Sequence, residues 1–79
     1  MPNFDLRIKH QRIEKGLSQT EIAKKMKISR QAISQFESGK VIPTLERLIE
    51  IAQILDVTLD ELVEFKKIHS DYSDELKKD

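Results

Sequence analysis

The sequence predicts an all-α domain of five short helices, and three observations support this prediction. Apolar residues recur at spacings of three and four along the chain, which is the period of an amphipathic helix, and no segment alternates with the period of a strand. A residue that commonly caps helices precedes each apolar stretch, and the two glycines follow two of these stretches. The length of 79 residues suits one compact domain.

The first two predicted helices occupy residues 4–15 and 19–25. Asn3 can cap the first helix through its side-chain oxygen. The expected inward residues of that helix are Phe4, Leu6, Ile8 and Ile13. Ser18 and Glu21 are three residues apart and fit a capping box, in which each side chain accepts a hydrogen bond from the other residue's backbone N–H. The expected inward residues of the second helix are Ile22, Ala23 and Met26.

The caps also predict the last three helices. Ser29 precedes a third helix over residues 30–37, Thr44 precedes a fourth and Thr58 precedes a fifth. The expected inward residues are Ile33 and Phe36 in the third helix, Leu45, Leu48, Ile49, Ala52 and Leu55 in the fourth, and Leu59, Leu62 and Val63 in the fifth. The predicted connections between helices are short, as in a compact helical domain.

The end of the chain leaves two alternatives open. An apolar stripe continues past the expected core at Phe65, Ile68, Tyr72 and Leu76. Either the fifth helix lies over its own domain, or the stripe associates with a second copy, because one small domain has little core left to cover it. We place the boundary of the domain at residues 1–69. Residues 70–79, an acidic and basic C-terminal tail, are expected to extend the last helix for self-association.

The charges are divided unequally between the two halves of the chain. Residues 1–40 contain nine basic and four acidic residues, whereas residues 41–79 contain five basic and ten acidic residues. The halves therefore carry net charges of +5 and −5. Two ordinary solvated helical surfaces would explain this distribution. It also suits a first half that faces a polyanion and a second half that is kept away from it.

The composition excludes several classes of protein. The chain has no cysteine, so it has neither disulfides nor thiolate metal sites. Its apolar runs are too short to span a membrane, and its first residues lack the plan of a signal peptide. His10 and His69 have no ligand-like spacing, and neither a phosphate-binding loop nor a nucleophile motif is found. We therefore expect a cytoplasmic protein that is not an enzyme, with no metal and no cofactor.

Residues 19–38 have the pattern of a helix-turn-helix, which is two short helices that cross steeply on either side of a tight turn. Ala23 is small enough for the two helices to approach closely, and Ile28 can fill the turn. Ile33 and Phe36 fasten the second helix to the core. Their burial directs four polar residues outward, namely Arg30, Gln31, Ser34 and Gln35.

With these residues the sequence resembles the phage-repressor (lambda Cro, XRE) family of helix-turn-helix transcriptional regulators. The resemblance extends from about residue 8 to residue 63 and is densest over residues 16–40. Residues 43–48 and 55–62 are similar to the family's fourth and fifth helices. The resemblance implies a compact, five-helix, lambda-repressor-like DNA-binding domain.

The resemblance also implies roles for individual residues. It places the helix of residues 30–37 in the major groove of double-stranded DNA. The positions that face base edges in the family are Arg30, Gln31, Ser34 and Gln35. The positions that contact phosphates are Gln19, Ser29 and, with the backbone beside it, Lys40. Arg12 and Glu37 match a pair that forms a partly buried salt bridge between the first and third helices of relatives.

The side-chain chemistry agrees with these roles, although exposed glutamines are usually solvated surface. An arginine side chain can form two hydrogen bonds with the edge of guanine, and a glutamine side chain can form two with the edge of adenine. Two features depart from the family. Lys27 stands in the turn where glycine is usual, and a positive φ there costs ~1–2 kcal/mol. We therefore expect Lys27→Gly to stabilise the fold, or at least to leave it unharmed. The net charge of zero suggests modest non-specific affinity for DNA.

We therefore expect a bacterial, phage-encoded or plasmid-encoded regulator associated with the nucleoid, most simply a repressor that binds a palindromic operator as a homodimer. A homodimer is expected because one domain contacts few base pairs, whereas two half-sites ~34 Å apart supply enough specificity. The alternative is a protein-interaction module or antitoxin whose acidic C-terminal half, including residues 64–79, binds a partner protein. The outward residues of the third helix favour DNA, because an adaptor needs none of them.

Overall fold

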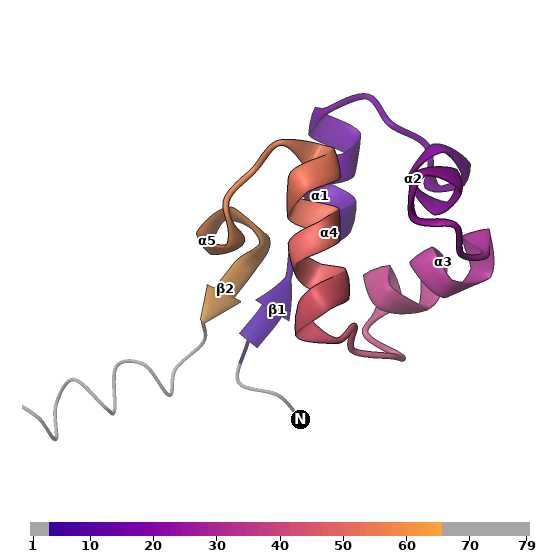
Figure 1. The fold of residues 1–79 in the computed structure, drawn as a ribbon. Helices are drawn as coiled ribbons and strands as arrows, with labels where there is room; N and C mark the ends of the chain where they lie inside the picture. The colour runs from indigo at the N-terminus through magenta and orange to yellow at the C-terminus, as the bar shows by residue number, and fades with distance from the viewer. Residues whose placement is uncertain (1–3, 66–79) are drawn as a thin grey trace, which may run out of the picture.

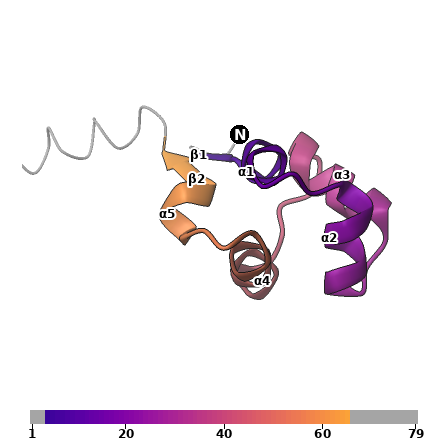
Figure 2. The same cartoon turned by 90° about the horizontal axis from the view of Figure 1, so that it is seen from above.

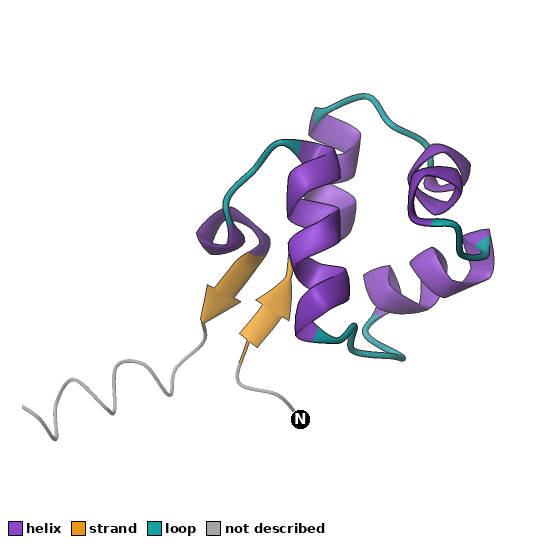
Figure 3. Ribbon diagram, viewed as in Figure 1, coloured by secondary structure: helices purple, strands orange, loops and turns teal. Residues whose placement is uncertain are grey.

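The computed structural model describes residues 4–65 of the chain (Figure 1). In chain order its elements are β1 (Phe4–Leu6), α1 (Ile8–Glu14), α2 (Gln19–Met26), α3 (Arg30–Ser38), α4 (Leu45–Leu55), α5 (Leu59–Leu62) and β2 (Val63–Phe65). The predicted five helices are confirmed, and a small two-stranded sheet joins them, as the colouring by secondary structure shows in Figure 3. Within the described part of the chain, no helix is long and apolar enough to cross a bilayer.

The helices α1 and α4 lie in the middle of the domain. The pair α2 and α3 lies on one side of them, and α5 with the sheet lies on the other, as both Figure 1 and Figure 2 show. The core between these elements receives side chains from all five helices. Its buried members are Ile8, Ile22, Ala23, Met26, Ile33, Ile51, Ala52, Leu55 and Leu62.

The prediction was wrong about the start of the first helix, which begins at Ile8 rather than at residue 4. The preceding residues form β1, which pairs with β2 in antiparallel register and places Phe4 opposite Phe65. The N–H of Arg7 continues the connection by donating to the carbonyl of Leu62 at 2.7 Å. Each strand has only three residues, which are too few to show an alternating pattern. The strand that it pairs with is distant in the sequence. A local pattern of spacing therefore could not predict either strand.

Four residues that were expected inside the protein are exposed. The exposed fractions are 60% for Ile13, 66% for Leu45, 39% for Ile49 and 38% for Leu59. Ile13 is five residues after the buried Ile8, which turns it about 140° away around the helix. Leu45 and Leu59 are each the first residue of a helix. Because Cα–Cβ bonds tilt toward the helix N-terminus, these side chains project past the end of the helix and away from the core.

The predicted N-caps within the described residues are observed at Ser18, Ser29, Thr44 and Thr58. The first is a complete capping box, and a second box links Thr58 to Glu61. Lys27 has a φ of 58°, so the expected left-handed turn is confirmed. Asp56 adopts the same conformation with a φ of 56°, which the sequence analysis did not anticipate. Asn3 and the tail of residues 70–79 lie outside the described residues. The predicted cap at Asn3 was nevertheless wrong, because α1 begins after Arg7. The helix predicted to bury Val63 and to continue through Phe65 ends at Leu62, and these two residues belong to β2.

Candidate nucleic-acid interface

A tight turn connects α2 to α3 and orients the two helices steeply (Figure 1). Lys27 ends α2 in the left-handed conformation, and the N–H of Ile28 then donates to the carbonyl of Ala23 at 3.0 Å. The side chain of Ile28 packs against the core. Ser29 begins the next helix, since its Oγ accepts at 3.1 Å from the backbone N–H three residues later. These contacts fix the direction in which α3 leaves the turn.

The outer face of α3 carries the residues predicted to contact bases. On the inner side, Ile33 is fully buried and Phe36 packs against the core. On the outer side, Arg30 and Gln31 are exposed, and Ser34 and Gln35 are half-buried. The structure therefore brings all four predicted residues to one polar surface, with a guanidinium and two amides along a single helix.

The residues predicted to contact phosphates lie at three separate places around α3. Gln19 is the first residue of α2 and is half-buried. Ser29 is the exposed N-cap of α3. Lys40 is exposed in the connection to α4, and its backbone N–H donates to the hydroxyl of Ser38 over a long 3.4 Å. A bond of that length is weak. The backbone N–H of Lys40, like its exposed ammonium group, is therefore available to donate to a phosphate.

Arg12 and Glu37 form an ion pair between α1 and α3, as expected. Nε of Arg12 lies 2.6 Å from Oε2 of Glu37, and Nη2 lies 3.2 Å from Oε1. The guanidinium also donates to the carbonyl of Leu17 at 2.9 Å. The side chains of Arg12 and Glu37 are only 12% and 4% exposed. A pair that is this well shielded costs much free energy to break, because the remaining charge stays buried without a partner.

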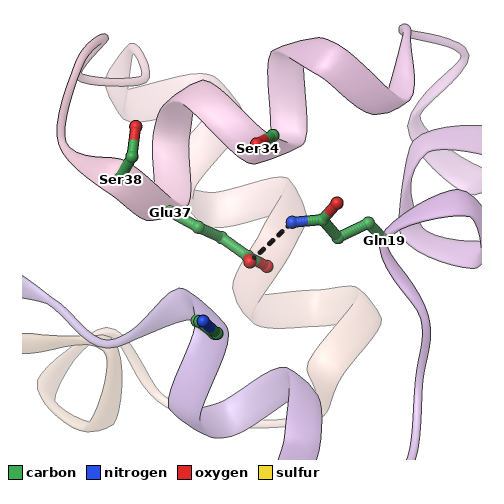
Figure 4. A pocket seen from close by; sticks show the side chains of 5 residues that line it. Gln19, Ser34, Glu37 and Ser38 are labelled. Carbon is green, nitrogen blue, oxygen red and sulfur yellow. Dashed lines mark hydrogen bonds between the residues drawn. The ribbon is translucent and has the colours of Figure 1, made fainter.

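An open depression of about 140 Å³ lies between α1, α2 and α3, and Figure 4 shows it from close by. Its lining residues are Lys9, Gln19, Ser34, Glu37 and Ser38. Lys9 was not predicted as part of the interface. Its position three residues before Arg12, on the same side of α1, is the signal that could have indicated it.

The contacts of Gln19 within the protein were not predicted. Its Nε2 donates to Oε1 of Glu37 at 2.9 Å, as the dashed line in Figure 4 shows. Its Oε1 accepts from Nη1 of Arg30 at 3.1 Å. The three residues come from different positions on two helices, and no local spacing connects them. Their proximity follows only from the way α2 and α3 pack.

A compact helical domain with a tight α2–α3 turn and a polar outer face on α3 defines the class of helix-turn-helix DNA-binding domains. The chain matches the Helix-turn-helix family over residues 8–62. It therefore belongs to this family of DNA-binding transcriptional regulators, as the resemblance to phage repressors predicted. The family is a class of regulators rather than of enzymes.

Relatives and solved structures agree with this assignment. The chain is 40% identical over 60 residues to the HTH-type transcriptional activator BcrR of Enterococcus faecalis, covering 76% of this chain and 29% of the activator. It is 36% identical over 56 residues to the cryptic phage CTXphi transcriptional repressor RstR of Vibrio cholerae, covering 71% of this chain and 50% of the repressor. The chain therefore spans half or less of both relatives. The N-terminal DNA-binding domain of SinR from Bacillus subtilis superimposes with a TM-score of 0.60 at 33% identity, covering 67% of this chain and 78% of that domain.

Proposed function

We propose that the protein is a repressor that binds a palindromic operator in double-stranded DNA as a homodimer, with α3 in the major groove. The outward face of α3 carries this proposal, since it presents Arg30, Gln31, Ser34 and Gln35 on one surface. The guanidinium suits O6 and N7 of guanine, and each amide suits N6 and N7 of adenine. A well-formed pair of this kind discriminates between bases by ~1–3 kcal/mol.

Phosphate contacts hold α3 in register in this proposal. Gln19 stands at the N-terminus of α2, where free backbone N–H groups and the helix dipole attract an anion. The hydroxyl of Ser29 accepts within the protein and keeps its own hydrogen for a phosphate. Lys40 and Lys9 are both exposed, and Lys9 lines the depression beside α3. Their ammonium groups add attraction for the phosphates.

The homodimer is supported by apolar side chains that are exposed at the start of α4. Leu45 and Ile49 are four residues apart on one face of α4 and are 66% and 39% exposed. Ile42 precedes the helix and is 52% exposed. These three exposed apolar side chains are called the stripe. The stripe follows directly after Lys40, and a second copy that covers it lies beside the DNA. Lys40 and Glu46 adjoin the stripe with opposite charges, which a two-fold axis can bring together.

Repression follows in this proposal from occupation of the operator. The likeness to the phage repressor RstR supports this direction of regulation, and the likeness to the activator BcrR makes activation the competing outcome. We further propose that residues 1–69 form the DNA-binding domain and that the protein acts in the cytoplasm, where its DNA is.

Selection of binding sites from a pool of random duplex DNA tests the function. At about 100 mM salt, a concentration that limits non-specific binding, we expect the wild-type protein to recover one two-fold symmetric motif. The double variant Arg30→Ala/Gln31→Ala should lose or change that motif. Lys24→Ala/Lys25→Ala is the matched control, because it removes two cationic side chains at the far end of α2 and should leave the motif unchanged.

Leu45→Glu tests the homodimer in the same system. We expect this variant to occupy single half-sites about as well as the wild type and to lose cooperative binding to the full site. Sedimentation of the protein–DNA complexes would show this difference. Recovery of no motif by the folded wild-type protein would contradict DNA recognition. A motif without symmetry would contradict the homodimer alone.

A further inference from the structure

A continuous chain of polar contacts connects the buried ion pair, through Gln19 of α2, to Arg30 at the start of α3. Arg12 binds the carboxylate of Glu37 at 2.6 and 3.2 Å. The same carboxylate accepts from Nε2 of Gln19 at 2.9 Å, and Oε1 of Gln19 accepts from Nη1 of Arg30 at 3.1 Å. The contacts begin at a side chain that is 4% exposed and end at an exposed arginine on the DNA-facing surface.

The direction of the Gln19 amide is determined by Glu37. A carboxylate paired with arginine can only accept hydrogen bonds, so the end of the amide that faces it must be the NH₂ group. The oxygen of the amide then points away from Glu37 and toward Arg30. The opposite orientation would place two acceptors together and would aim the NH₂ group at a cation. Each contact therefore fixes the next one.

The ion pair also fixes the position of Glu37. Its carboxylate has two contacts with Arg12, and Arg12 is itself held by the carbonyl of Leu17. Because both side chains are shielded from water, the carboxylate cannot turn away from Gln19 without breaking these bonds. An exposed arginine normally samples many rotamers and loses that freedom when it binds. In this protein Arg30 is already held by a fixed acceptor.

We propose that Glu37 is a positioning residue for base recognition, which acts through Gln19 to orient the guanidinium of Arg30. This inference rests on the proposed function. It gives the buried ion pair a role in specificity in addition to its role in stability.

A cycle of single and combined variants on DNA tests this inference. The readout is discrimination, meaning the ratio of Kd values for the preferred operator and for one changed at the base pair that Arg30→Ala identifies. We expect Gln19→Ala to lower this ratio about tenfold, within the range of one arginine–guanine pair, and to leave discrimination at other base pairs unchanged. Glu37→Gln should produce the same loss, because its amide no longer dictates the orientation of Gln19.

The combined variants separate a connected chain from independent effects. Adding Glu37→Gln to Gln19→Ala should produce no further loss of discrimination, and neither change should matter once Arg30→Ala is present. Gln19→Ala leaves the ion pair intact, so this part of the test survives even when Glu37→Gln folds poorly. Ile51→Val is the control for stability, since it removes a buried methyl group of α4, a helix that supplies no side chain to the chain of contacts. It should not change base preference.

A measurement without DNA distinguishes failure of this inference from failure of the proposed function. NMR relaxation of the Arg30 Nε–H should report a more mobile guanidinium in Gln19→Ala and in Glu37→Gln than in the wild type or in Ile51→Val. Unchanged mobility, or losses of discrimination that add, would overturn the inference. Absence of specific DNA binding by the wild type would contradict the proposed function. The relaxation data would then still show whether Gln19 and Glu37 orient the guanidinium of Arg30.

Discussion

The two sides of the domain are held together by different interactions. Each side contains a complete capping box. The α2–α3 side adds a buried ion pair and a chain of side-chain hydrogen bonds that reaches from α1 to the surface of α3. On the other side, the β1–β2 sheet and α5 depend mainly on backbone pairing between distant segments. The ion pair there, between Arg7 and Glu64, has a 3.8 Å separation and side chains that are 39% and 64% exposed.

The comparison shows which side of the domain is held more rigidly by side-chain contacts. Polar side chains with several partners each fix the position of the surface that is proposed to meet DNA. The opposite side needs only to close the core, and backbone bonds together with Leu62 accomplish this. We therefore expect side-chain substitutions to have unequal effects on the two sides. Three predictions test that expectation, and a fourth tests a feature that the two sides share.

The largest difference is expected between the two ion pairs. Glu37→Ala leaves the guanidinium of Arg12 buried without a carboxylate and should lower the free energy of unfolding by ~3–5 kcal/mol. Glu64→Ala removes an exposed pair and should cost no more than ~1 kcal/mol. Urea unfolding of both variants measures the difference. A cost under about 1 kcal/mol for Glu37→Ala would mean that the buried pair does not stabilise the α2–α3 side.

The N-caps provide a comparison of intermediate size. Ser18→Ala removes the cap of α2 and should cost ~1 kcal/mol of global stability, because α2 supplies three buried residues to the core. Thr58→Ala removes the cap of α5, which has only four residues. We expect this change to open the end of the sheet locally and to accelerate hydrogen exchange of the Arg7 amide, with exchange in α2 unchanged. Equal protection changes on both sides would contradict the comparison.

The two left-handed residues that are not glycine are expected to respond differently to replacement. Lys27→Gly relieves strain of ~1–2 kcal/mol and adds freedom to the unfolded chain worth ~0.4–1 kcal/mol, so a net gain between zero and ~1.6 kcal/mol is expected. Asp56→Gly should gain less, since aspartate tolerates this conformation better than lysine does. Denaturation midpoints check both values. A clear drop in melting temperature for Lys27→Gly would show that its left-handed conformation is not strained.

The smallest expected effect is a loss of stability at acidic pH, and both sides of the domain should contribute to it. Backbone and side-chain hydrogen bonds from Ser18 hold the pKa of Glu21 below its ordinary value of 4.5, and those from Thr58 do the same for the pKa of Glu61. A depressed folded-state pKa contributes stability that is present above the unfolded-state value and is lost as the pH falls through the folded-state value. The melting temperature of the wild type should therefore approach that of Glu21→Gln/Glu61→Gln between about pH 5 and pH 3.

A constant difference between these two proteins over that range would contradict the carboxylate caps. Glu46→Gln is the matched control, because Glu46 lies in the first turn of α4 without a capping box. It should follow the pH dependence of the wild type.

The helices and the turn could be predicted because their causes lie within a few residues of one another. Ser18 and Glu21 show a helix start, and the buried Ile33 implies which side of α3 faces outward. The strands could not be predicted this way, since β1 is extended only because β2 is there to pair with it. The same reason applies to Gln19, whose contacts depend on the packing of two helices, and to the exposed Leu45, whose position at a helix end decides its burial.

The antiparallel register of β1 and β2 has a consequence for engineering. It places residues 4 and 65 side by side, on the side of the domain opposite α2 and α3 (Figures 1 and 2). A second domain joined directly before residue 4 or directly after residue 65 would therefore start from nearly the same point. Either junction would lie on the far side of the domain from α3, so the fused domain would not cover the surface that is proposed to meet DNA.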